Sequence, residues 1–291
     1  MYILKTKGTA KIPDYFQVRD ENFVLVNHFK SDLPGKILNI EELKDRYEEI
    51  LEIIKTIQYG ELKKNKLNYK NRMNEIVSLQ NIGVTCNENK ILSDVSLYVY
   101  PGEFIYLKGK TGAGKTCLLR SLFADLSINE GEAFVADFDL INISKNEIPF
   151  LRRKLGLISQ NFGLLNDRNI FENLIFAIEA ADIKNRKYIK NKVLQVLEKV
   201  ELADKTKCMP YELSKAEKQQ VVLARAIINN PVLIIADEPT CNLDSESSAI
   251  IMKLLVNESK SGVSVIVATH NSGLIEQFPG KEFTIENFTL K

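Results

Sequence analysis

The sequence contains no tryptophan and only two histidines, His28 and His270. Its four cysteines are scattered along the chain and form no CxxC pair. Structural zinc sites are built from closely spaced Cys and His, so this pattern argues against a Cys/His metal cluster. Free thiols without a pairing framework are typical of a reducing compartment, and we expect the protein to be cytoplasmic.

The sequence also lacks long hydrophobic runs and an excess of one charge. Its longest apolar stretches, around Val221–Ile228 and Val263–Ala268, are well short of the ~20 residues that a membrane-spanning helix needs. The first residues show no continuous apolar segment of the signal-peptide kind. We therefore expect no direct membrane insertion and membrane contact only through a partner. With 39 Lys and Arg against 38 Asp and Glu, no nucleic-acid partner is expected.

The N-terminal part is predicted to be a small β–α module over residues 1–66. Apolar residues at helical spacing predict a helix over 40–64, and the polar residues 67–74 are typical of a linker. Two interpretations of the module remain open: a structural appendage or joined upstream reading frame, and a regulatory or docking domain. Met73 precedes a segment typical of a domain start. Met73 is therefore, besides Met1, a second candidate for the start of translation. Two or three short strands are predicted before the helix, in residues 2–8, 15–20 and 22–29.

The pattern of the sequence changes after the linker. Two alternating strands, IVSLQNIGV and SDVSLYVY, precede a turn at Pro101–Gly102 and a third strand, FIYLKG. Beyond these, short apolar strands alternate with helical segments, which is typical of an α/β core. We therefore predict one α/β domain over residues 75–291.

The strand FIYLK continues directly into GKTGAGKT, which opens the helix TCLLRSLFADL. This is the P-loop spacing in the strand–loop–helix context that the motif requires. Its glycines let several backbone N–H groups face nucleotide phosphates, and the helix N-terminus adds partial positive charge. Lys115 should contact the β- and γ-phosphates, and Thr116 should bind Mg²⁺. The residues expected at the phosphates are Gly109, Lys110, Thr111, Gly112, Ala113, Gly114, Lys115 and Thr116.

Four further polar residues follow predicted strands. Asp237 and Glu238 end the apolar strand in VLIIADEPT, Gln160 follows GLIS, and His270 follows VIVAT. The Asp237 carboxylate would hold Mg²⁺, directly or through water, and Glu238 would polarise the attacking water. We expect Gln160 to contact the magnesium and the water, and His270 to hydrogen-bond the γ-phosphate. The predicted catalytic residues are Glu238, His270 and Gln160.

The order of P-loop, glutamine, Leu-Ser helix start, ADEPT, NLD and ATH resembles the ATP-binding-cassette (ABC) superfamily over essentially all of residues 75–291. The resemblance implies a P-loop ABC nucleotide-binding domain with a RecA-like α/β core, an antiparallel β subdomain and a helical signature subdomain. It implies ATP and Mg²⁺ as ligands, ATP hydrolysis, and a homodimer in the ATP-bound state. Two ATP would lie between the P-loop of one copy and the signature helix of the other, and the dimer-interface loop would comprise Asn242, Leu243 and Asp244.

A narrower resemblance lies in IPFLRRKLGLISQNFGLLNDRNIFENL, residues 148–174. It is similar to the FtsE-like ATPases of the bacterial cell-division complex FtsEX, whose LLxDR phrase matches Leu164–Arg168. This implies an FtsX-like integral membrane subunit that docks here and controls peptidoglycan hydrolysis, with the chain peripheral on the inner face of the membrane. Two alternatives stay open: a lipoprotein-releasing or export transporter ATPase, and a low-turnover ATP-gated scaffold.

The signature segment departs from the family's LSGGEQQR, because residues 213–220 read LSKAEKQQ. Ser214 and Glu217 still form a Ser-x-x-Glu capping box, so the helix should begin as expected. Ser214 can still offer its hydroxyl to the partner's γ-phosphate. Lys215 and Ala216, however, replace two glycines, and a Cβ at each position should hinder close backbone approach to phosphate. Reduced turnover is therefore predicted.

Two smaller departures concern the nucleotide. Thr85 and Cys86 stand where the family usually places an aromatic that stacks on adenine. Stacking on an aromatic is worth about 1–3 kcal/mol per base in nucleic-acid complexes, so weaker nucleotide binding is predicted. Cys241 replaces the glycine before Asn242. The metal- and phosphate-handling side chains are all retained, so ATP binding is expected.

Overall fold

The computed structural model describes residues 2–6, 15–19, 25–30, 62–64, 75–86, 89–181 and 183–290. The chain divides into two compact units, Met1–Met73 and Asn74–Lys291. The linker predicted at 67–74 and most of the helix predicted at 40–64 lie outside the described residues.

The described part of the first unit is an antiparallel sheet with the strand order β3-β2-β1-β4. Its strands are β1 (Tyr2–Thr6), β2 (Tyr15–Arg19), β3 (Leu25–Lys30) and β4 (Leu62–Lys64). The three predicted strands are confirmed. The predicted end of the helix is wrong, because Leu62–Lys64 pairs with β1 as a strand. Pairing with the edge of β1 satisfies backbone groups of this short segment, and local periodicity contains no signal for such a long-range contact.

The second unit is built on a six-stranded sheet with the order β10-β11-β12-β7-β13-β14. The first five strands run parallel, and β14 pairs antiparallel with β13. The strands are β7 (Phe104–Lys108), β10 (Leu155–Ile158), β11 (Leu233–Asp237), β12 (Ser264–Ala268), β13 (Lys281–Glu286) and β14 (Thr289–Leu290). The helices are α3 (Lys115–Leu122), α4 (Ile148–Arg153), α5 (Ile170–Glu179), α6 (Arg186–Lys199), α7 (Lys215–Ile227), α8 (Ser245–Lys260) and α9 (Ser272–Gln277).

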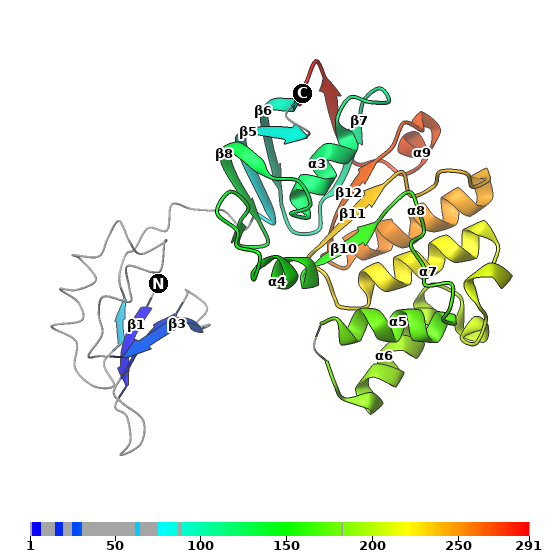
Figure 1. Ribbon diagram of the computed structural model, residues 1–291, viewed down its shortest axis with the longest axis horizontal. Coiled ribbons are helices and arrows are strands. Elements are labelled where there is room, and N and C mark those ends of the chain that lie inside the picture. Colours follow the sequence, from blue (N-terminus) through cyan, green and yellow to red (C-terminus); the bar gives the residue numbers. More distant parts are fainter. Residues whose placement is uncertain are drawn as a thin grey trace. The chain divides into compact units, whose positions relative to one another are not determined.

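Alternate residues of each central strand enter two different hydrophobic cores. In β11, Ile234 and Ala236 pack with residues of α5, α6, α7 and α8. Leu233 and Ile235 face the other way and pack with α3 and a second sheet. Both faces of the parallel sheet are therefore covered, which explains why β11 is a continuous apolar run. Figure 1 shows α3 and helices α5–α8 on opposite sides of β10–β12.

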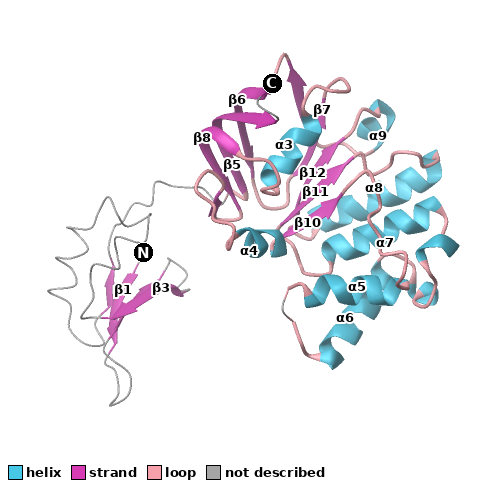
Figure 2. Cartoon of the chain, viewed as in Figure 1, coloured by secondary structure: helices cyan, strands magenta, loops and turns pink. Residues whose placement is uncertain are grey.

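The second sheet is antiparallel and has the order β6-β5-β8-β9. Its strands are β5 (Val77–Cys86), β6 (Asn89–Val99), β8 (Ile128–Val135) and β9 (Phe138–Asp139). Together with the parallel core and the helical part around α5–α7, it gives the three predicted subdomains (Figure 2). Within the described ranges, no helix is both long enough and apolar enough to cross a membrane.

Candidate active site

The P-loop lies between the end of β7 and the start of α3, as predicted. Gly109 has φ +147° and Gly114 has φ +105°, conformations that L side chains rarely adopt. A Cβ on Gly109 would lie 2.8 Å from the Ile285 carbonyl oxygen, and one on Gly114 would lie 2.9 Å from Cδ2 of Leu92. Glycine at these two positions therefore lets the loop curl tightly against both sheets. The loop residues are Gly109, Lys110, Thr111, Gly112, Ala113 and Gly114.

Lys115 is the first residue of α3 and points its ammonium back over this loop. Its side chain is buried, and Nζ donates to the carbonyl oxygens of Gly109 at 2.7 Å and Lys110 at 3.2 Å. These contacts hold the cation at the mouth of the loop, where a phosphate oxygen can replace a carbonyl as its acceptor. The side chain is therefore pre-positioned for the predicted phosphate contact.

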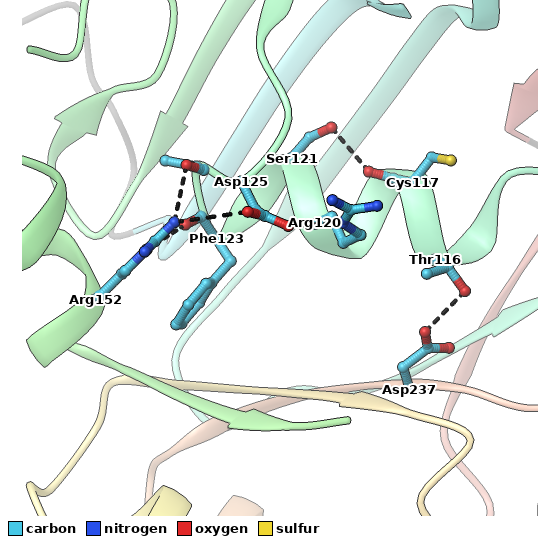
Figure 3. A network of polar contacts seen from close by, with 9 residues as sticks. Thr116, Cys117, Arg120, Ser121, Phe123, Asp125, Arg152 and Asp237 are labelled. Atoms are coloured by element: carbon cyan, nitrogen blue, oxygen red, sulfur yellow. Dashed lines mark hydrogen bonds and ion pairs between the residues drawn. The ribbon is translucent and has the colours of Figure 1, made fainter. Parts of the chain in front are cut away.

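Thr116 and Asp237 meet across the P-loop, although 121 residues separate them. The hydroxyl Oγ1 of Thr116 donates to Oδ2 of Asp237 at 2.7 Å (Figure 3). Burial raises the pKa of Asp237, the charge of Glu238 adds to the rise, and the hydrogen bond from Thr116 opposes it. A hydroxyl and a carboxylate oxygen are ligands that Mg²⁺ accepts, and a cation here would relieve the cost of burying the carboxylate. The donor set thus fits magnesium.

Glu238 follows β11 directly and is paired with His270, which follows β12. Oε1 of Glu238 lies 2.7 Å from Nδ1 of His270. Glu238 has φ +46°, and its backbone N–H donates to the carbonyl oxygen of Ala268 at 2.9 Å. The Glu238 side chain is 16% exposed and that of His270 is 72% exposed. A carboxylate in a strained backbone conformation, aligned by an imidazole, is typical of a functional site.

Gln160 lies two residues beyond the end of β10, close to the loop after Glu238. Its Nε2 donates to Sγ of Cys241 at 3.7 Å, and the backbone N–H of Cys241 donates to the Glu238 carbonyl oxygen at 3.1 Å. The sequence drew attention to Cys241 as a replacement for glycine, but it contained no signal for this contact. Gln160 is therefore next to the Glu238 loop.

The predicted dimer-interface loop is shaped by one left-handed residue and one helix cap. Asn242 has φ +63°, and the N–H of Leu243 donates to the Thr240 carbonyl oxygen at 3.2 Å. Asp244 caps α8, where its Oδ1 accepts from the N–H of Ser247 at 2.8 Å. This hydrogen bond lowers the pKa of Asp244. The loop is thus held rigidly at both ends.

The signature residues lie at the start of α7 and form the predicted capping box. Ser214 Oγ accepts from the N–H of Glu217 at 3.2 Å, and Glu217 Oε2 accepts from the N–H of Ser214 at 2.8 Å. Lys205 donates to the other oxygen of Glu217, which lowers the pKa of that carboxyl. Lys215 is exposed and Ala216 is half-buried. The hydrogen bonds given above for Ser214 and Glu217 join these two residues and Lys205, and none of them involves the P-loop. The structure therefore does not bring the signature together with the P-loop of the same chain.

A cavity of about 220 Å³ lies beside the P-loop. Thr269 and Ser272 are two of the lining residues that sequence reasoning missed. Their position next to His270 in the segment ATHNS could have identified them as site residues from the sequence. The complete lining is Lys108, Gly109, Lys110, Thr269, His270, Ser272 and Ile275.

The P-loop helix is also tied to α4 through Arg152. Its Nε donates to the Phe123 carbonyl oxygen and its Nη2 to that of Ala124, each at 3.2 Å. Its guanidinium lies 4.9 Å from the Phe123 ring centroid and 4.0 Å from Oδ1 of Asp125. Figure 3 shows this contact near the end of α3 and the Thr116–Asp237 pair at its start. Arg152 thus joins the C-terminal end of α3 to α4.

Comparison with known proteins agrees with this geometry. Residues 92–241 match the family described as ABC transporter. The cell division ATP-binding protein FtsE of Streptococcus pneumoniae is 40% identical over 215 residues, which cover 74% of this chain and 91% of that protein. FtsE of Bacillus subtilis is 39% identical over 201 residues, covering 69% of this chain and 88% of that protein. FtsE of Escherichia coli is 36% identical over 196 residues, with coverages of 67% and 88%.

A similar solved structure is a dimeric ATP-binding cassette in a post-hydrolysis state with ADP and phosphate bound. It has a TM-score of 0.66 and 28% identity, covering 74% of this chain and 96% of that one. The sequence motifs, the sheet order and these similarities agree. The chain therefore belongs to the ABC transporter family of ATPases and, within it, to the FtsE cell division ATP-binding proteins.

Proposed function

We propose that this ATPase works as a homodimer with an FtsX-like membrane subunit on the inner face of the cell membrane, where ATP cycling controls peptidoglycan hydrolysis during division. The observation that carries the proposal is the convergence of Thr116–Asp237 and Glu238–His270 at one edge of the sheet beside the P-loop. The FtsE names of the relatives favour this role over lipoprotein release or export.

Phosphate binding is assigned to the P-loop. The backbone N–H groups of residues 109–116 and the N-terminus of α3 surround the phosphates, and Lys115 places its ammonium between the two terminal ones. Thr116 and Asp237 would hold Mg²⁺, which when bound neutralises phosphate charge and polarises the phosphoryl oxygens. The Thr116–Asp237 contact at 2.7 Å supports this assignment, because it places a hydroxyl oxygen and a carboxylate oxygen side by side.

Water activation is assigned to Glu238. Its carboxylate would accept a proton from the attacking water, while His270 contacts one carboxylate oxygen and no side chain among the described residues is hydrogen-bonded to the other. Gln160 would orient the same water once its weak contact with Cys241 is given up. His270 is mostly exposed, so its second ring nitrogen is accessible to the γ-phosphate.

The dimer would complete each site with the signature of the second copy. The dimeric cassette that the chain resembles supports this arrangement. Ser214 would contact the partner's γ-phosphate, and the loop Asn242–Asp244 would cross the interface. Lys215 and Ala216 carry Cβ atoms where close approach favours glycine, and they are expected to slow formation of the closed state.

Restoring both glycines tests that expectation. We expect Lys215→Gly/Ala216→Gly to raise steady-state ATP turnover by about tenfold, because one hydrogen bond to a charged phosphate is worth about 1.5–3 kcal/mol. Phosphate release by the double variant and the native protein measures the difference. Lys218→Gly, a lysine-to-glycine change one turn further along α7, is the control for helix destabilisation. Equal rates for native and repaired proteins would make Lys-Ala a fully working signature.

The docking surface is proposed on α4 and α5. Phe150 on α4 is 56% exposed and Phe176 on α5 is 49% exposed, which is unusual for phenylalanine. Arg153 lies 5.1 Å from the Phe150 ring centroid, and Arg168 lies 5.2 Å from that of Phe176. Arg153 also donates from Nε to the Ala180 carbonyl oxygen at the end of α5, which joins the two helices into one surface. Aromatic and arginine side chains are enriched at the centres of protein interfaces.

The LLNDR segment is held beside this surface by a buried asparagine. Asn173 is 1% exposed, its Oδ1 accepts from the Leu165 N–H at 2.8 Å, and its Nδ2 donates to the Leu165 carbonyl oxygen at 3.1 Å and to that of Arg168 at 3.0 Å. The loop carrying Arg168 is thereby fixed next to Phe176. The contact through Arg152 links the same surface to α3 and so to the nucleotide.

Removing the two exposed phenylalanine rings tests directly whether this surface binds the membrane subunit. We expect Phe150→Ala/Phe176→Ala to reduce co-purification of the membrane subunit by at least about tenfold, because interface aromatics often contribute 2 kcal/mol or more. ATP binding should be unchanged, since neither ring touches the P-loop. Tyr188→Ala, which removes a ring that is 46% exposed on α6, is the matched control. Full retention of the membrane subunit by the double variant would refute this docking surface.

A further inference from the structure

The C-terminal hairpin has an unusual residue in its turn. Strand β13 ends at Glu286 and β14 begins at Thr289, so Asn287 and Phe288 form a two-residue turn. Both are left-handed, with φ +49° and +66°. Two-residue turns of this kind strongly favour glycine at the second position, because an L side chain is strained there. Phe288 is thus held in a conformation that its own side chain disfavours.

The Phe288 side chain is also 58% exposed, although phenylalanine is usually buried. Its backbone is fixed, because its carbonyl oxygen accepts from the N–H of Ser93 at 2.8 Å. Strand β14 lies against β6, which carries Ser93. A strained, exposed and rigidly held aromatic is a candidate for ligand contact.

The segments that hold Phe288 also touch the P-loop at both ends. Ile285, three residues before Phe288, comes so close to Gly109 that a Cβ there would lie 2.8 Å from its carbonyl oxygen. Leu92, the neighbour of Ser93, comes so close to Gly114 that a Cβ on that glycine would lie 2.9 Å from Cδ2 of Leu92. The turn is therefore adjacent to the phosphate-binding loop.

The strand order indicates which end of the nucleotide lies near this turn. The groups proposed for hydrolysis, Glu238 and His270, follow β11 and β12, and the P-loop follows β7. The γ-phosphate end therefore lies on the β11–β12 side, and the nucleoside extends the other way, across β13 and β14. Two strand spacings are about 10 Å, which brings the base to the turn. Figure 1 shows the red C-terminal hairpin beside β6, at the same edge as the loop that follows β7.

We propose that Phe288 is the residue on which the base of bound ATP stacks. The ring would supply a sequence-tolerant π surface at the end of the sheet opposite the hydrolytic groups, and positions 85 and 86, Thr85 and Cys86, offer no aromatic for that purpose. Glycine at position 288 would relieve the backbone strain, but it would leave the base without an aromatic surface. This explains why the strained phenylalanine is kept. The proposal depends on ATP binding by the P-loop and is independent of the membrane partner.

A single tryptophan at this position reports stacking directly, because the chain has none of its own. We expect saturating ATP to quench the emission of Phe288→Trp at least twofold and inorganic tripolyphosphate, which has no base, to leave it unchanged. Tyr188→Trp on α6, where Tyr188 is 46% exposed, is the matched control and should respond to neither ligand. Emission of Phe288→Trp that is insensitive to bound ATP overturns the proposal.

Replacing Phe288 with glycine distinguishes an effect on binding of the base from an effect on the stability of the fold. We expect Phe288→Gly to raise the Kd for ATP about tenfold, to leave the Kd for magnesium tripolyphosphate unchanged, and to raise Tm because the strain is relieved. Phe288→Tyr should keep the native Kd. Unchanged ATP affinity in Phe288→Gly, or an equal loss for both ligands, overturns the assignment, since the second outcome means that the change acts through the P-loop and not through the base.

Discussion

We expect replacement of Glu238 with glutamine to lower ATP turnover by about 10²–10⁴-fold, to leave ATP binding intact and to let the ATP-bound dimer accumulate. A positioned general base contributes about this factor, and glutamine keeps the shape of the side chain but has no basic oxygen. The contact with His270 at 2.7 Å can be kept by the amide oxygen, so the site should stay assembled. Phosphate release measures turnover, and gel filtration with ATP measures the dimer.

Glu246→Gln is the matched control for this change, because Glu246 is an exposed carboxylate in the first turn of the nearby helix α8. It removes the same charge without touching the site and should leave turnover at the native level. If Glu238→Gln kept both native turnover and the native monomer–dimer balance, Glu238 would not be the group that activates water.

We expect replacement of Lys115 with alanine to weaken ATP binding by about 100-fold and to abolish ATP-dependent dimerisation. The ammonium is the main buried cation at the loop, and a charge-assisted hydrogen bond to phosphate is worth about 3 kcal/mol. Removing it also takes the ammonium donor from the carbonyl oxygens of Gly109 and Lys110, so the loop loses a restraint, although the Lys110 oxygen still accepts from the N–H of Ala113 at 3.1 Å. Equilibrium ATP binding and gel filtration measure the two effects.

Lys110→Ala separates the charge of Lys115 from the general positive charge of the loop. Lys110 belongs to the same loop, but its side chain is exposed and only its backbone is expected to face the phosphates. This variant should lose much less affinity than Lys115→Ala. Equal losses, or ATP-dependent dimerisation by Lys115→Ala, would contradict the P-loop assignment.

The core of the site could be predicted from sequence because its motifs are local. The P-loop is one continuous segment between a strand and a helix, and Asp237 and Glu238 come directly after the apolar residues 233–236 of β11. Parallel strands place their carboxyl ends at one edge, so His270 after β12 had to lie near Glu238 after β11. The capping box of Ser214 and Glu217 depends on two residues three apart, and the structure contains it.

Other features depend on contacts between distant segments. The strand β4 exists through pairing with β1, 58 or more residues earlier in the chain, and its short sequence has no strand period of its own. The contact of Gln160 with Cys241 joins two loops whose approach is set by packing of β10 beside β11. The position of Phe288 beside the P-loop follows from the order of β7, β13 and β14, which spacing along the chain does not reveal.

Steady-state phosphate release by the purified chain in Mg²⁺ and ATP, alone and with its membrane subunit, tests the central claim most directly. The native protein should release phosphate, more so with the membrane subunit, and Glu238→Gln should release almost none while still binding ATP. The account would be contradicted if the native protein bound ATP but released no phosphate under either condition, and if the Lys215→Gly/Ala216→Gly variant released none either. The protein would then be a nucleotide-gated scaffold.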